Sequence, residues 1–526
     1  MKKYLLRRIL HGLLSIFLVV VIVMIMIYSL LDRERIFASD PKYAKLMNNQ
    51  QTVYKYRCWQ NYGYLDFLQY SDYLQMLANQ GEITEETRQA AVNLGRKPSD
   101  DSELVTEYVK KFEAYCERNG YTVQRLNAIT KRQQLVTGGA QQLFAYRDHS
   151  LLNRLWSYFS GLIQIDNIHA EEDPEIGARG LTFTWYDPVY GGKKFSPAVM
   201  GNGTHHKYLL YCDSSFPFIH QNMLSLRLGK SYSVNQEDAE KDVFATMTRS
   251  QDPKVPSLIT YPTGLVEYSA DDLHTATYVS GSLETNAMYR DRYTDNYTNV
   301  ATVKSGKSPI GYSFTIGIIA TILAYLIAIP MGIWVTLRKD KLADHLSTFY
   351  IVFIMAVPGV AYILMFKAVG FAVGLPTTFK TEETSKLQYI LPIVSLALPQ
   401  IANLIRWLRR YMIDQKNSDY VKFARSGGLS EGEIFSKHIL KNAIIPIVHG
   451  IPGAILGAMT GAFITERVYV VPGVGGLLID AIGAYDNGII VGVTLFYAAI
   501  SVVSLILGDL LMSLVDPRIN FTAKAR

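Results

Sequence analysis

The hydrophobic and polar residues of this chain are separated into long blocks. The first apolar block, residues 9–31, holds 23 residues without a formal charge. At 1.5 Å per residue it is long enough to cross a hydrocarbon core of about 30 Å. It exceeds the length of a secretory signal core, and no small-residue cleavage motif follows it, so we expect a retained transmembrane helix. Five more apolar runs, which bring the expected spans to six, are residues 311–337, 348–371, 389–405, 443–465 and 488–515.

The segment between the first two apolar blocks, residues 32–310, has no comparable run. From Leu104 to Cys116, apolar residues recur every three or four positions, and Gly120 ends the pattern, which predicts an amphipathic helix. Residues 181–186 and 207–212 are rich in aromatic and β-branched side chains, which predicts strands. We therefore expect a soluble α+β domain inserted between the first two membrane helices.

The overall composition averages these two unlike parts. Hydrophobic residues make up 49% of the 526 positions and charged residues 19%, which fits neither a disordered chain nor an ordinary soluble protein. Residues 32–310 contain 33 acidic and 30 basic side chains, whereas the rest of the chain contains 13 acidic and 22 basic ones. The net charge of +6 therefore comes from the membrane part, so it gives no reason to expect nucleic-acid binding.

The basic residues also predict how the chain is oriented. They gather before the first predicted helix, between the second and third, between the fourth and fifth, and after the sixth. Lys and Arg beside membrane spans are retained on the cytoplasmic side. We therefore expect a multi-pass protein of the cell membrane with both termini in the cytoplasm and residues 32–310 outside the cell.

All three cysteines, Cys58, Cys116 and Cys212, fall in the segment that we expect outside the cell, where disulfides can form. Their number is odd, and sequence alone gives no pairing. One disulfide with one free thiol and three free thiols are both compatible with the sequence.

Three short motifs suggest catalysis or ligand binding but lack the context that this chemistry needs. Residues 428–432 read Gly-x-Ser-x-Gly, yet no strand precedes them to form a nucleophile elbow. Residues 229–231 read Gly-Lys-Ser, but Leu224 replaces the first glycine of a phosphate-binding loop. His205 and His206 are adjacent and have no cluster of further ligands. We expect no catalytic residue, metal or cofactor in this chain.

The connection between the fourth and fifth apolar runs has a distinct pattern. Tyr420, Phe423 and Ala424 can share one side of a short helix. Gly428 suits the positive φ at its end, and Ser430 begins a second helix as part of a capping box. The sequence predicts a rigid knob, although an ordinary amphipathic connection would explain the same pattern.

Residues in and after this connection resemble the coupling motif of ABC importer permeases, in the form found in oligopeptide and dipeptide permeases. The family's leading Glu-Ala-Ala is absent, and its proline comes later than in sugar or phosphate importers. Residues 465–475 resemble an outer element of the same family, with Glu466, Pro472, Gly473 and Gly475 at its marked positions. The large insertion is similar to that of B-type permeases of Gram-positive oligopeptide systems of the Ami type. The coupling motif matches at Ala424, Arg425, Gly428, Leu429, His438, Asn442, Ala443 and Pro446.

The resemblance implies an α-helical membrane protein with the type I ABC importer permease fold. Its parts would be an N-terminal helix (1–31), an extracellular inserted domain (32–310) and a permease core (311–526) with a coupling loop at about 406–442. The chain would be a transport subunit and not an enzyme, because partner ATPases bind the ATP and Mg²⁺. The residues implied to contact an ATPase are Tyr420, Ala424, Arg425, Gly428, Leu429, Ser430 and Glu431.

The implied partners are a second homologous permease, two ATPase subunits, a lipid-anchored extracellular binding protein, the peptide substrate and membrane lipids. Gly453, Gly457 and Gly461 recur every four residues, and we expect them to let helices approach closely near the translocation path. Two other functions remain open at this stage. The chain could be a membrane-tethered extracellular peptide sensor, or an importer of the same family that carries nickel or haem.

Overall fold

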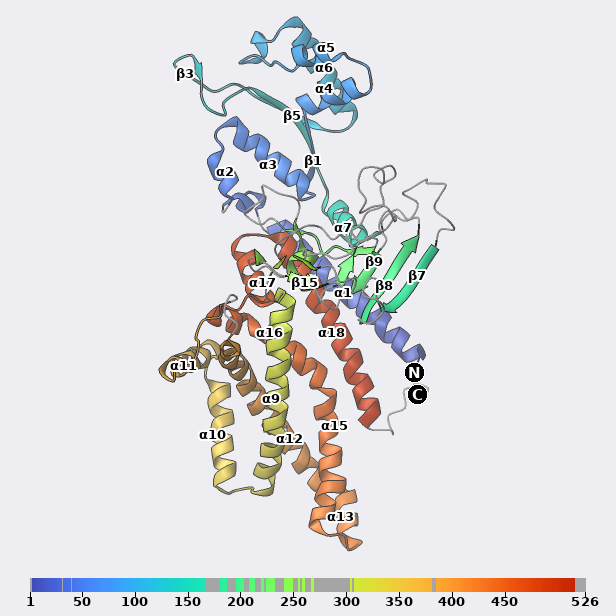
Figure 1. The fold of residues 1–526 in the computed structure, drawn as a ribbon, viewed down its shortest axis with the longest axis vertical. Coiled ribbons are helices and arrows are strands. Elements are labelled where there is room, and N and C mark those ends of the chain that lie inside the picture. Colours follow the sequence, from blue (N-terminus) through green and yellow to red (C-terminus); the bar gives the residue numbers. More distant parts are fainter. Residues whose placement is uncertain are drawn as a thin grey trace.

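The computed structural model is elongated, with long helices in its middle (Figure 1). Residues 32–165 form a lobe of helices and strands at one end, which we call the outer lobe, and helix α13 lies at the opposite end. The residues that the structure describes are 2–30, 32–38, 40–165, 180–186, 195–202, 208–212, 219–221, 224–231, 241–248, 254–255, 258–260, 266–268, 303–304, 307–380 and 385–515.

Within these ranges, four continuous helices are long and apolar enough to cross a membrane. The second of them begins where the hydroxyl of Ser308 accepts a hydrogen bond from the backbone N–H of Gly311, at 3.1 Å. Pro330 and Pro399 lie inside the second and third without ending them. The four helices are α1 (Lys2–Leu30), α9 (Pro309–Leu337), α12 (Ile390–Lys416) and α18 (Asn487–Val515).

The predicted third span, residues 348–371, is not one straight helix. It divides into α10 (Leu342–Ala356) and α11 (Gly359–Ala372), which meet at 112°. Val357 is extended, with ψ of 129°, because a residue before proline avoids the helical region. Pro358 then starts the new helix in another direction.

The predicted fifth span, residues 443–465, is also divided. Helix α15 (Lys441–His449) ends at Gly450, and α16 (Ile451–Tyr469) continues after a bend of 42°. A second bend, of 82°, separates the end of α16 from α17 (Val474–Gly483). The described chain therefore has bent helix pairs where the sequence predicts two single helices.

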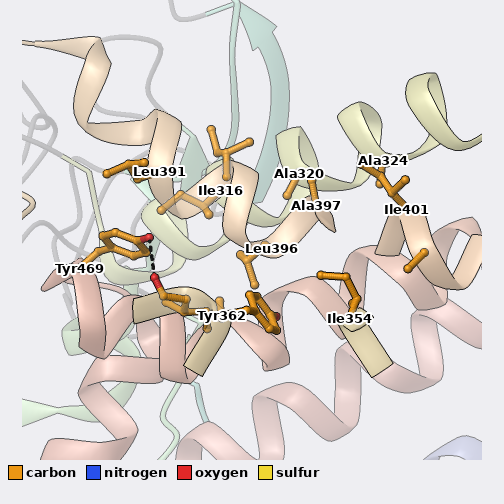
Figure 2. Close-up of a cluster of buried hydrophobic side chains, with 14 of the residues drawn as sticks. Ile316, Ala320, Ala324, Ile354, Tyr362, Leu391, Leu396, Ala397, Ile401 and Tyr469 are labelled. Carbon is orange, nitrogen blue, oxygen red and sulfur yellow. Dashed lines mark hydrogen bonds between the residues drawn. The ribbon is translucent and has the colours of Figure 1, made fainter. Parts of the chain in front are cut away.

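Small side chains bring α9 and α12 close together. Ala320 and Ala324 of α9 face Ala397 of α12 in a buried cluster (Figure 2). Helices without a water-driven hydrophobic force associate through such close packing. The larger side chains around them fill the space between α9, α12, α10, α11 and α16: Ile316, Ile354, Tyr362, Leu391, Leu396, Ile401 and Tyr469.

The outer lobe is built on a three-stranded antiparallel sheet in the order β1-β5-β2. Helix α6 (Glu103–Arg118) covers one side and confirms the predicted amphipathic helix. The hydroxyl of Ser102 caps its start, and Gly120, with φ of +70°, follows its end. The other elements of the sheet and its cover are β1 (Leu65–Gln69), β2 (Thr122–Leu126), β5 (Gln142–Asp148), α3 (Asn49–Asn61), α4 (Tyr70–Asn79) and α5 (Glu85–Ala91).

A second antiparallel sheet, in the order β10-β9-β8-β7, confirms both predicted strands. Its strands are β7 (Gly180–Tyr186), β8 (Phe195–Asn202), β9 (Tyr208–Cys212) and β10 (Ile219–Gln221). His205 and His206 lie outside the described residues. The remaining short elements up to α9 are η1 (Arg33–Phe37), α2 (Pro41–Lys45), η2 (Pro98–Asp100), β3 (Thr130–Lys131), β4 (Gln134–Leu135), α7 (Leu151–Ser160), β6 (Ile163–Ile165), β11 (Leu224–Leu226), β12 (Lys230–Ser231), β13 (Lys241–Asp242), α8 (Val243–Thr248), β14 (Lys254–Val255), β15 (Leu258–Thr260), β16 (Val266–Tyr268) and β17 (Val303–Lys304).

Buried polar contacts join the outer lobe and strand β12 to the start of α18. Asn487 donates a hydrogen bond to the hydroxyl of Tyr64 in the outer lobe, at 2.9 Å. Ser231 donates to Asp486 at 2.6 Å, and the other oxygen of this carboxylate accepts from the N–H of Ile489. The lysine and serine of the Gly-Lys-Ser motif therefore form a short strand beside the start of α18. The serine hydroxyl is hydrogen-bonded to the Asp486 carboxylate.

The other end of α18 is fixed to the N-terminal helix. The Asp509 carboxylate accepts hydrogen bonds from the hydroxyl of Tyr4 at 2.8 Å and from the guanidinium of Arg8 at 3.0 Å. One face of Gly12 lies directly against Val502, so the backbones of α1 and α18 approach closely. The first and last membrane helices are therefore neighbours.

Cys58 and Cys116 are both buried in the outer lobe as free thiols. Burial raises the pKa of each thiol to about 11. Only the backbone of Cys212, in β9, is described. Any disulfide among the three cysteines would include Cys58 or Cys116. Because both are free thiols here, the structure agrees with three free thiols and not with one disulfide.

We expect both buried thiols to resist alkylation in the folded protein. In a Cys212→Ser background at pH 8, native chains should react on the order of a hundred times more slowly than unfolded ones, because the thiolate is the nucleophile and burial suppresses it. Mass spectrometry before and after denaturation measures this. We expect two alkylated cysteines after denaturation without reductant and almost none before it. Rapid labelling of the native chain would show that the thiols are not buried. A cysteine that stays unlabelled in the unfolded chain would show that it is not a free thiol.

Candidate functional site

The segment between α12 and α15 forms the knob (residues 417–440), which lies at the end of the molecule opposite to α4, α5 and α6 (Figure 1). It consists of α13 (Asp419–Ser426), α14 (Glu431–Glu433) and the π-helix η7 (Ile434–Leu440). The predicted coupling loop starts too early, because residues 406–416 are the last turns of α12. Leu408 and Met412 continue the buried face of this helix, which explains why it extends beyond the apolar run.

The turn between α13 and α14 is fixed by backbone bonds. The N–H of Leu429 donates to the carbonyl of Ala424 at 3.3 Å, and the N–H of Gly428 donates to that of Arg425 at 3.1 Å. This is the Schellman arrangement, and Gly428 has the positive φ, +83°, that it requires. The local sequence predicts this turn.

A capping box starts the next helix directly after this turn. The hydroxyl of Ser430 accepts from the N–H of Glu433, and the Glu433 carboxylate accepts from the N–H of Ser430, both at 3.3 Å. These hydrogen bonds hold the pKa of the Glu433 carboxyl below its usual range, so it is ionised at neutral pH. With one helix end closed and the next helix start capped, the knob has a defined angle.

Apolar packing anchors one side of α13 to the helices of the membrane core. Val421 and Ala424 are buried, and the wider cluster comprises Leu408, Met412, Ile434, Ile439, Ala443 and Ile447. Tyr420, Phe423 and Ala424 do not all share one side, contrary to our expectation, because Val421 and Ala424 form the buried face and leave the other two exposed. The Phe423 side chain is 79% exposed.

The exposed side of the knob carries apolar side chains that the core does not cover. Tyr420 and Leu429 are exposed like Phe423. Tyr420 is also braced, since its hydroxyl donates to Gln415 at 2.5 Å and accepts from Asn442 at 3.0 Å. Phe423 was missing from the residues implied by the coupling motif; its aromatic side chain within a charged segment was the available signal.

An ion pair crosses the glycine turn. The guanidinium of Arg425 lies 2.5 Å from the carboxylate of Glu431 and holds the pKa of that carboxyl below its usual range. Both side chains are exposed, so the pair adds little to global stability. Its position, with one partner on each side of the turn, suits it to limit movement between α13 and α14.

We expect the Arg425→Glu variant to lose several-fold in ATP-driven uptake and the Arg425→Glu/Glu431→Arg double variant to regain most of it. The reversed pair can still cross the turn, whereas the single variant places two like charges there. Uptake into proteoliposomes measures both. The matched control is Lys422→Glu, because Lys422 pairs with Asp419 within α13 and does not cross the turn. A double variant as weak as the single one would contradict the bracing role.

A second cluster surrounds Glu466, whose side chain is 1% exposed at the end of α16. Its carboxylate accepts hydrogen bonds from the hydroxyl of Ser313 at 2.7 Å and from the N–H of Gly476 at 3.0 Å. Ser313 in turn accepts from the N–H of Val474 at 3.0 Å. The carboxylate therefore caps the first turn of α17, where unpaired N–H groups favour a negative charge.

The glycines of the outer element make room for this carboxylate. A Cβ atom at Gly473 or Gly475 would collide with Glu466, and at Gly475 it would also come within 2.8 Å of the Phe463 backbone. Pro472 lies in the turn between the two helices, where the N–H of Gly473 donates across it to Val471. Hydrogen bonds and close contacts of this element therefore join α9, α16 and α17. We call the cluster of Glu466, Ser313, Gly473 and Gly475 the Glu466 lock.

Two of the three glycines of α16 have open space around them in this structure. Gly453 and Gly457 are exposed, and a Cβ atom on either would meet nothing within 4 Å, so within the described residues neither lies against another helix. The surroundings of Gly461 lie outside what the structure describes. Close approach to α16 is made from the other side, by Gly317 of α9, whose Cβ position lies 3.0 Å from the Met459 side chain.

Comparison with known proteins identifies the family. Residues 328–521 match the family model described as the binding-protein-dependent transport system inner membrane component. The oligopeptide transport system permease protein AmiC of Streptococcus pneumoniae is 33% identical over 533 aligned positions, covering 100% of this chain and 99% of that protein. This chain belongs to the oligopeptide transport permease family. It is the membrane component of an ABC importer, and the family consists of permease subunits.

Shorter members of the family align with part of the chain. The dipeptide transport system permease protein DppB of Bacillus subtilis is 30% identical over 213 residues, which cover 40% of this chain and 68% of that relative. Among solved structures, an amino acid ABC transporter is similar with a TM-score of 0.31, 16% identity and coverage of 40% of this chain and 92% of the other. The inward-facing MetNI methionine transporter gives a TM-score of 0.32 at 13% identity, with coverage of 39% and 93%.

Proposed function

We propose that this chain is a transmembrane permease subunit of an ATP-driven oligopeptide importer. The observation that carries the proposal is the full-length similarity to an oligopeptide permease, which includes the segment between α1 and α9. The knob and the Glu466 lock are formed by the two segments whose sequences resemble the coupling motif and the outer element of this family. A second homologous permease would complete the translocation path, and two ATPase subunits would bind ATP and Mg²⁺.

The knob is proposed to transmit movement from an ATPase to the membrane helices. Its closed turn and capping box fix its angle, while Val421 and Ala424 bind it to α12 and α15. Phe423, Tyr420 and Leu429 offer an apolar surface for a groove on the ATPase. Because the knob is rigid and anchored, a displacement of the ATPase would move the helices with it instead of bending the connection.

The orientation follows from the charges, within the same proposal. Basic residues flank the knob end of the bundle, so this end and both termini would be cytoplasmic. The outer lobe, at the other end, and the rest of the segment 32–310 would then be extracellular. The chain would then cross the membrane six times. The bent pairs α10–α11 and α15–α16 would each count as one of these crossings.

The outer lobe is proposed to dock a lipid-anchored peptide-binding protein and to enclose the peptide during transfer. It is the first part of the inserted segment 32–310, which precedes the permease core in sequence, and Tyr64 joins it to α18 at Asn487. Replacing residues 70–120 with a short Gly-Ser linker removes α4, α5 and α6 but keeps this contact. Loss of binding-protein association in a chain that still inserts and assembles is expected; unchanged association and uptake would refute the docking role.

Transport itself is tested by reconstitution of the complete importer in proteoliposomes. Labelled peptides of graded length should accumulate only with ATP and the binding protein, and nickel or haem should neither accumulate nor compete. Peptide binding without accumulation would overturn the proposal in favour of a sensor. Accumulation of nickel or haem alone would overturn the proposed cargo while leaving the importer assignment intact.

A further inference from the structure

Helix α7 (Leu151–Ser160), at the base of the outer lobe, packs one apolar side against α1. The rings of Phe159 and Phe17 have centroids 4.9 Å apart. Leu155 and Tyr158 join the same buried cluster, which includes Val20 of α1. Helix α7 is therefore attached to the surface of a membrane-spanning helix.

The contacts place α7 beside the C-terminal half of the α1 span. Near its start, the guanidinium of Arg154 lies 5.4 Å from the ring of Tyr28, at the end of the α1 span. Near its end, Phe159 meets Phe17, which lies eleven residues earlier in α1, or about 16 Å along a helix axis. Phe17 is near the middle of the span Tyr4–Ser29. The Phe159 side chain therefore extends from α7 toward the middle of this span.

A second apolar side of α7 is left uncovered. Leu152 and Trp156, one helical turn apart, are each 76% exposed. The helix that α7 packs against, α1, also has exposed apolar side chains, including Phe17 and Leu18, which a membrane span presents to lipid. The neighbouring residues Asn153 and Ser157 are polar and lie on another side of the helix.

We propose that α7 is an interfacial helix whose Leu152–Trp156 stripe inserts into the lipid leaflet at the C-terminal end of α1. Tryptophan favours the boundary between headgroups and acyl chains, and the Arg154 guanidinium, which donates to the Tyr64 carbonyl at 3.2 Å, holds the start of α7 to the outer lobe. The stripe would hold the base of the outer lobe against the membrane. This inference requires only that α1 spans the membrane, so it does not depend on the cargo or on which side the lobe lies.

Spin labels on adjacent residues test the insertion. In a Cys212→Ser background, with Cys58 and Cys116 buried, the variants Leu152→Cys and Trp156→Cys are compared with Asn153→Cys and Ser157→Cys in lipid nanodiscs. Labels at 152 and 156 should collide more with oxygen than with a water-soluble nickel chelate, by several-fold relative to 153 and 157. Equal exposure to the chelate at all four positions would overturn the proposal. Protection of 152 and 156 from both reagents would also overturn it, since it would show a protein partner there.

Intrinsic fluorescence gives an independent test without a new cysteine. The difference between the wild-type chain and Trp156→Phe isolates the emission of Trp156. Brominated phospholipids should quench this difference signal, and aqueous iodide should not. Quenching by iodide alone would contradict insertion even if a labelled variant failed to fold.

Discussion

Replacing Gly428 with valine is expected to reduce ATP-driven peptide uptake at least tenfold while the chain still inserts into the membrane. Gly428 has a φ of +83°, where a residue with a Cβ atom is strained by about 1–2 kcal/mol, and a β-branched one is a particular outlier. No neighbouring atom lies within 4 Å of a Cβ at this site, so the strain comes from the backbone and not from a collision. The turn should relax into another angle and displace α13.

The matched control is Gly432→Val. Gly432 also has open space around its Cβ position, but it lies in α14 without a positive φ. Uptake and ATP hydrolysis are measured in the same proteoliposomes. We expect importers with the Gly428→Val permease to hydrolyse ATP at a rate that peptide does not stimulate. Importers with Gly432→Val should behave nearly as wild type. If the two variants were equally active, the angle of the knob would not matter for coupling.

Replacing Glu466 with alanine is expected to destabilise the membrane core strongly. The hydroxyl of Ser313 and the N–H of Gly476 would lose their buried acceptor, and leaving each buried group unpaired costs about 1–3 kcal/mol. The first turn of α17 would also lose its negative cap. Thermal unfolding in detergent should therefore shift to lower temperature, and uptake should fall with it.

Two variants give the comparison for this result. Glu466→Gln keeps the size and one acceptor oxygen, so its loss of stability should be smaller than that of Glu466→Ala. Arg467→Ala removes the neighbouring side chain, whose ion pair with Asp480 is exposed, and should change stability by less than about 1 kcal/mol. An effect of Glu466→Ala no larger than that of Arg467→Ala would show that the buried carboxylate is not a lock.

Local features of the site could be read from the sequence because neighbouring residues determine them. The helix end at Gly428 and the capping box at Ser430 depend on residues within a few positions, and both are present. The break at Pro358 was harder to predict, because membrane helices tolerate proline, as α9 does at Pro330. Which proline breaks a helix depends on whether neighbouring helices can satisfy the freed carbonyl groups.

Features that depend on distant residues could not be predicted. The role of Glu466 depends on Ser313, 153 positions earlier, and Asp486 binds Ser231 across 255 positions. No local pattern marks either pair. Gly453 and Gly457 repeat at the spacing of a packing motif, yet no helix in the described part of the chain covers them. Their spacing alone does not say whether the partner belongs to the same chain.

Photo-crosslinking from position 423 tests most directly the claim that the knob couples this permease to an ATPase. A photoreactive amino acid replaces Phe423 in the assembled importer, and the control replaces Leu135, an exposed apolar residue of the outer lobe. We expect position 423 to capture an ATPase subunit and Leu135 to capture none. An importer that takes up peptide normally while position 423 never crosslinks to an ATPase would contradict the account.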